Sequence, residues 1–129
     1  MKLIEYFKIT LLTFISPWLY GYYFDVIDHH HYLPYLNKIL NPALYPNDYF
    51  FSQPHGLYSP FNNVIIFITR FFNLGFDWIY FFLYLISLWI LYYSVYLLAK
   101  TLYRQSGVAL LAVFFFIMPK WAAQIGYMT

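Results

Sequence analysis

The stretch DWIYFFLYLISLWILYYSVYLLAK, from Asp77 to Lys100, constrains the fold of this chain more than any other. No charged residue interrupts it between its two ends. A helix needs about 20 mostly apolar residues to cross the roughly 30 Å of hydrocarbon in a bilayer. The segment from about Trp78 to Ala99 meets this requirement, so the sequence predicts a membrane-spanning helix there.

The composition of the whole chain agrees with a membrane protein. Its 129 residues are 63% hydrophobic and only 9% charged, whereas a soluble domain carries about 25% charged residues. The formal net charge of +2 is too small to indicate nucleic-acid binding. Without cysteine, neither disulfides nor thiolate metal sites are available. We therefore expect an all-α integral membrane protein that lies in the lipid bilayer and binds no nucleic acid.

A first span is predicted from about Ile4 to Phe24, ahead of the central apolar stretch. Pro17 and Gly21 would break a soluble helix, but membrane helices tolerate both. A cleaved signal peptide is the alternative, and it would need small residues after the apolar run. The bulky sequence LYGYYFDV stands there instead, which favours a retained anchor.

A third span is predicted to begin near Val108, and it is apolar only to Met118, before Pro119 and Lys120 interrupt it. It is either a short span or the start of a longer one. With it, we expect about three transmembrane helices. The predicted segments are a first span (1–24), a long loop (25–77), a second span (78–99), a short loop (100–107) and a third, short or incomplete span (108–129).

Lysine and arginine in short loops predict the orientation, because such residues are enriched on the cytoplasmic side. Lys2 and Lys8 flank the first span, and Lys100 and Arg104 lie between the second and third. Both places are therefore expected in the cytoplasm, together with the N-terminus. The acidic loop of residues 25–77 is then expected outside.

The long loop contains two helix signals. The sequence YLNKIL predicts a short helix that Asn41-Pro42 would end. Further on, Ser59 is a good N-cap, Pro60 fits the first helical position, and apolar residues then recur at helical spacing. We expect this amphipathic helix, about 60–73, to lie in the membrane interface. A re-entrant helix packed inside the protein is the alternative.

Asp25 and Asp28 lie just beyond the first span, where an ionisable group is a candidate for function. In a continuing helix, Asp25 would share a face with His29, and Asp28 with His31. Such pairs can hold a divalent metal ion, or one carboxylate can act as a general base toward an acceptor hydroxyl. Alternatively, these aspartates and histidines are simply solvated where the helix leaves the membrane.

Three more residues of the long loop are candidates. Asp48 follows a proline turn, where it can bind a ligand or cap the next turn. His55 stands in the polar sequence SQPHGLYS. Arg70 is the only arginine of the loop, and so its only bidentate phosphate clamp. Snorkelling to lipid headgroups is the alternative for Arg70.

The layout resembles a known class of membrane enzymes. An acidic residue follows the first span, the loop carries YLP, NPALYPND and YSPF, and LYLISLWILYYSVYLLAKTLY follows an amphipathic helix. This is similar to the N-terminal part of uncharacterised multispan bacterial proteins related to the GT-C superfamily, integral-membrane glycosyltransferases that use polyprenyl-phosphate-linked sugars. The resemblance implies the bacterial inner membrane. It also implies a base or metal ligand at Asp25 or Asp28, with Asp48 as an auxiliary carboxylate.

The same resemblance makes Arg70 and His55 candidate contacts for the phosphate or sugar. Because GT-C enzymes carry many more spans, we expect a fragment or half of a split protein, inactive without its remaining spans or partner subunits. The alternative is a small non-enzymatic helical membrane protein with a structural role, or with His29 and His31 as metal ligands. A transporter fragment is the third interpretation. It would need buried charges within the spans, and the predicted spans lack them.

Overall fold

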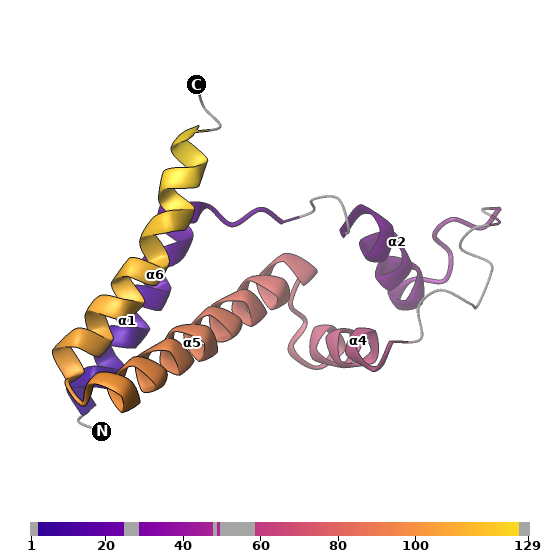
Figure 1. The fold of residues 1–129 in the computed structure, drawn as a ribbon. Helices are drawn as coiled ribbons and strands as arrows, with labels where there is room; N and C mark the ends of the chain where they lie inside the picture. Colours follow the sequence, from indigo (N-terminus) through magenta and orange to yellow (C-terminus); the bar gives the residue numbers. More distant parts are fainter. Residues whose placement is uncertain (1–2, 25–28, 48, 50–58, 127–129) are drawn as a thin grey trace. The chain divides into compact units, whose positions relative to one another are not determined.

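The computed structural model describes residues 3–24, 29–47, 49 and 59–126, and for residues 20, 29–31 and 118–126 it describes the backbone alone. These residues form five helices and no strand, which confirms the predicted all-helical class for this part of the chain. Figure 1 shows α1 (Leu3–Tyr20), α2 (His29–Leu40), α4 (Pro60–Phe72), α5 (Phe76–Tyr103) and α6 (Ser106–Gly126). The chain divides into two compact units, residues 1–22 with 83–129, and residues 23–82.

Helix α5 is the one described helix that is long and apolar enough to cross a membrane. Its 28 residues contain the whole predicted second span, and at 1.5 Å per residue they extend about 42 Å. Asp77 lies in its first turn and Lys100 in its last, where their charges oppose the ends of the helix dipole. This helix supports an association of the chain with membranes.

Helix α1 ends at Tyr20, whereas the predicted first span continues to Phe24. The reason is Gly21, which adopts the left-handed conformation with φ of 73°. Glycine enters this region without the steric cost that other residues meet, and it commonly terminates helices in this way. Pro17 lies inside the helix, as predicted. By length and composition α1 does not qualify as a span by itself.

Helix α6 follows α5 after a short turn at Arg104 and Gln105. Arg104 is left-handed, with φ of 55°, and its N–H donates to the carbonyl of Lys100 at 2.9 Å. The α6 backbone stays helical through Pro119 and Lys120. These two residues therefore interrupt the predicted apolar run, but they do not end the helix.

The core of the first unit is formed by α1, α5 and α6. Helices α1 and α6 lie side by side and run in the same direction (Figure 1). The small residues Ala99 of α5 and Ala109 of α6 are both buried in this core, and small residues are common between membrane helices. The buried side chains of this core come from all three helices: Ile9, Leu88, Tyr92, Tyr96, Ala99, Ala109, Val113 and Ile117.

In the second unit, α2 and α4 are in contact. Helix α2 begins at His29, earlier than the predicted YLNKIL helix, and includes Pro34. It ends at Leu40, directly before Asn41-Pro42, as predicted. The Asn41 side-chain oxygen accepts from the N–H of Ala43 at 3.1 Å, which stabilises the turn that follows.

Helix α4 begins and ends almost where the sequence predicts. Ser59 is extended, and its hydroxyl accepts from the N–H of Phe61 at 3.3 Å. Pro60 takes the first helical position, and Asn73 ends the helix in the left-handed conformation. The predicted N-cap is thus confirmed. The side chains that α4 buries are Asn62, Ile65 and Ile66.

Candidate functional site

The predicted catalytic residues Asp25, Asp28 and Asp48 lie outside the described residues, as does His55. His29 and His31 open α2, where the structure describes the backbone but not the side chains. Among the described side chains, no group of three histidines or carboxylates is placed to hold a metal ion. The proposed roles of all these residues therefore stay predictions.

Arg70, the predicted phosphate contact, lies on α4 and reaches α2. Its Nη2 donates to the backbone carbonyl of Ile39 at 3.3 Å. Ile39 is in the last turn of α2, where carbonyl groups lack partners within the helix. Arg70 therefore helps to cap α2 and ties the two helices together. Its side chain is nevertheless exposed, so its other guanidinium donors remain accessible to an anion.

An ion pair between Glu5 and Lys100 is the polar contact that the sequence reading missed. Lys100 Nζ donates to Glu5 Oε2 at 3.0 Å. The Glu5 side chain is only 9% exposed, and that of Lys100 is 32% exposed. The expectation that the predicted spans lack a buried charge is therefore wrong for Glu5. Its burial is tolerated because a cation from another helix compensates it.

Side chains from α5 and α6 complete the surroundings of this pair. The side chain of Ser106, at the start of α6, lies near the Glu5 carboxylate. The Lys100 ammonium lies 5.4 Å from the centre of the Tyr96 ring, a distance typical of a cation–π interaction. One buried carboxylate thus holds the N-terminal end of α1 to the turn between α5 and α6.

Two hydrogen bonds join α1 and α5 farther along. The hydroxyls of Ser16 and Tyr92 are 2.7 Å apart, and Trp89 Nε1 donates to Thr10 Oγ1 at 3.0 Å. Together with the Glu5–Lys100 pair, these contacts place the N-terminal part of α1 beside the second half of α5. The N-terminus of α1 and the turn after α5 lie at the same end of this helix pair.

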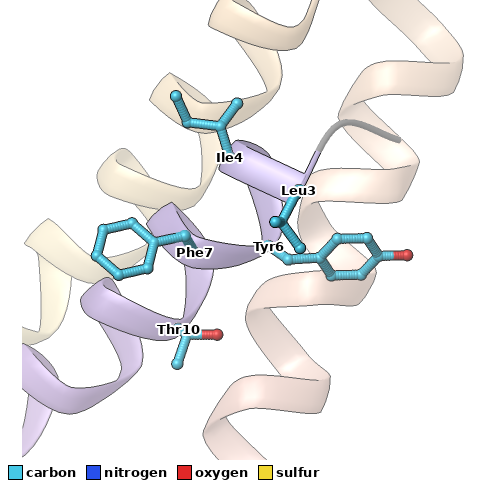
Figure 2. A pocket seen from close by; sticks show the side chains of 5 residues that line it. All are labelled: Leu3, Ile4, Tyr6, Phe7 and Thr10. Atoms are coloured by element: carbon cyan, nitrogen blue, oxygen red, sulfur yellow. The ribbon is translucent and has the colours of Figure 1, made fainter.

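An open groove of about 620 Å³ lies on α1, lined by Leu3, Ile4, Tyr6, Phe7 and Thr10 (Figure 2). Its lining contains no charged side chain. The Thr10 hydroxyl already accepts from Trp89, and the Tyr6 ring stacks on Tyr93 with centroids 5.8 Å apart. The groove therefore offers mainly apolar surface.

A comparison with known protein families, with curated proteins and with solved structures found no match to this sequence. Four of the described polar side chains join helices: Glu5, Thr10 and Ser16 bind α5, and Arg70 binds the end of α2. What the geometry defines is thus a helical module with interhelical polar contacts. Its candidate chemistry lies in the segment between α1 and α5.

The ion pair leads to a prediction about stability. Lys100→Met should lower the melting temperature of the detergent-solubilised protein by several degrees, because Glu5 stays buried without its cation. The exchange of both residues, Glu5→Lys with Lys100→Glu, should restore part of the loss. Lys8→Met removes an exposed lysine of the same helix pair and serves as the control. If Lys8→Met lowers the melting temperature as much as Lys100→Met does, the ion pair does not specifically stabilise the protein.

Proposed function

We propose that this chain is an integral membrane protein in which α1, α5 and α6 all cross the bilayer. The observation that carries the proposal is α5, whose large apolar side chains, including Phe82, Ile86, Ile90 and Leu98, are mostly turned outward. In water such a surface would be unfavourable, whereas lipid covers it without cost. The Glu5–Lys100 pair supports a topology in which the N-terminus and the 104–105 turn share one side of the membrane, and the lysine and arginine distribution favours the cytoplasm for that side.

The function that fits this arrangement best is that of an N-terminal membrane module in a GT-C-like glycosyltransferase of the bacterial inner membrane. Its substrate would be a polyprenyl-phosphate-linked sugar. The support is the layout of the sequence, in which Asp25 and Asp28 directly follow the predicted first span.

The proposed reaction uses one of these carboxylates as the general base. It takes the proton from an acceptor hydroxyl while the hydroxyl oxygen attacks the anomeric carbon of the sugar. The bond from that carbon to the phosphate oxygen breaks, and polyprenyl phosphate leaves with the electron pair. Arg70 and His55 would bind the leaving phosphate. Asp48 would assist as a second carboxylate. A divalent ion held by His29 or His31 would also bind the phosphate.

Substitution of the three acids in the complete protein tests this function. The reading frame beyond Thr129 is followed first, since the proposal expects an in-frame continuation rich in apolar segments. Asp25→Asn, Asp28→Asn and Asp48→Asn are then assayed for sugar transfer from a radiolabelled polyprenyl-phosphate sugar in membranes. The base variant should lose about 100-fold or more of the rate.

Asp77→Asn is the matched control, because this exposed acid lies in the first turn of α5 and outside the proposed site. Its transfer rate should stay near that of the unchanged protein. Full activity in all three candidate variants would contradict the catalytic proposal.

A non-enzymatic structural role is the second candidate, favoured by the use of the described polar side chains in helix contacts. It predicts no sugar transfer by the complete protein. In its metal-binding form, zinc binds the purified chain stoichiometrically, and His29→Ala with His31→Ala abolishes the binding.

A further inference from the structure

Helix α4 carries apolar side chains on two opposite faces. One face is buried and contains Ile65 and Ile66. On the other face lie Val64, Phe67 and Phe71, which are 53%, 64% and 70% exposed. Their spacing of three and four residues places them in one stripe along the helix. The rings of Phe67 and Phe71 stack with centroids 5.8 Å apart, which makes the stripe continuous.

The connection to α5 fixes where this stripe can be. Helix α4 ends at Phe72 and α5 begins at Phe76, and the four peptide steps between them reach about 14 Å when fully extended. Asn73, in the left-handed conformation, turns the chain within this connection. If α5 enters the bilayer near its first residues, α4 must lie at the membrane surface.

The charge and polarity of α4 fit the same position. Its sequence, PFNNVIIFITRFF, contains one arginine and no acidic residue. At helical spacing, Asn63 and Arg70 fall on one flank of the stripe, and both are exposed. A cation on the flank of an apolar stripe can reach anionic headgroups while the stripe enters the acyl region.

We infer that the stripe of Val64, Phe67 and Phe71 inserts into the outer lipid interface, so that α4 lies flat on the bilayer with its other face on the protein. The occupant of this face is lipid. The inference rests on the proposal that α5 crosses the membrane. It adds that residues 60–72 hold the second unit against the lipid surface, near lipid-linked ligands.

Spin labels test the inference in the full chain, which contains no cysteine of its own. Single variants Val64→Cys, Phe67→Cys and Phe71→Cys are labelled with a nitroxide and reconstituted in vesicles of phosphatidylcholine and phosphatidylglycerol. Collision rates with oxygen, which concentrates in lipid, are compared with those of a water-soluble nickel chelate. The oxygen-to-nickel ratio should be several-fold higher at all three sites than at Asn63→Cys on the flank.

Ile90→Cys in the middle of α5 separates the possible failures. A lipid signal at Ile90 with water exposure along the stripe overturns the inference and leaves the membrane span intact. Low collision rates with both reagents at Val64 and Phe67 would mean that protein covers the stripe, which also overturns it. A water signal at Ile90 would refute the span and the inference together.

Discussion

Ile90→Arg should lower the stability of the protein in lipid bilayers by about 3 kcal/mol, because arginine at the centre of a membrane helix costs roughly that amount. Ile90 lies in the middle of α5 and is exposed. On the surface of a water-soluble helix the same change would be nearly neutral. The variant thus separates lipid from water as the medium around α5. Extraction by alkaline carbonate and unfolding in bilayers measure the effect.

Leu102→Arg is the control for this prediction. Leu102 is also exposed, but it lies in the last turn of α5, close to Lys100. There an arginine can extend to the headgroups, so the change should be tolerated. Equal behaviour of the two variants, with both remaining stable and membrane-bound, would contradict a bilayer around the middle of α5.

Tyr92→Ala should destabilise the protein by about 3–5 kcal/mol, the range for truncating a buried aromatic side chain. Tyr92 is 2% exposed and belongs to the core of α1, α5 and α6. The substitution removes the ring from this core, and it also removes the hydrogen bond with Ser16. Unfolding of the detergent-solubilised protein in increasing denaturant measures the loss.

Two controls separate the ring from its hydroxyl. Tyr92→Phe keeps the ring and should cost only about 1 kcal/mol, because the Ser16 hydroxyl still donates to the carbonyl of Leu12 at 2.9 Å. Tyr103→Ala truncates an exposed tyrosine of the same helix and should change little. A loss at Tyr92→Ala no larger than at Tyr103→Ala would show that this core does not form.

The helices could be predicted where local signals are strong. The long charge-free apolar run predicted the α5 helix, and Ser59-Pro60 followed by helical spacing predicted the start of α4. The end of α2 before Asn41-Pro42 was also predicted by a local sequence signal. The end of α1 was missed because Gly21 can sit within a membrane helix or end it, and the sequence alone does not decide between these conformations.

The contacts between helices were beyond the sequence reading, because they join residues far apart in the chain. Glu5 and Lys100 are separated by 95 positions. A signal was nevertheless present: Glu5 stands near the start of the first predicted span and Lys100 directly after the second, and the predicted topology puts both of these ends in the cytoplasm. Opposite charges at matching depths of two antiparallel helices favour a pair, and this reasoning would have found the contact.

The candidate site was predicted from single residues and their place relative to the membrane. Of these residues, Arg70 alone has a described side chain, and its contact with Ile39 had no sequence signal because backbone carbonyls carry no residue identity. The carboxylates and histidines rest on the sequence pattern. Their roles depend on the side of the membrane that the segment between α1 and α5 occupies.

Labelling of single cysteines tests this topology most directly. Asn47→Cys lies in the segment between α1 and α5, and Gln105→Cys lies in the turn after α5; both positions are exposed, and the chain has no other cysteine. A membrane-impermeant maleimide should label Asn47→Cys in cells whose outer membrane has been removed and whose inner membrane is intact. It should label Gln105→Cys only after the inner membrane is opened. Labelling of Gln105→Cys in intact cells, with Asn47→Cys protected, would contradict the account.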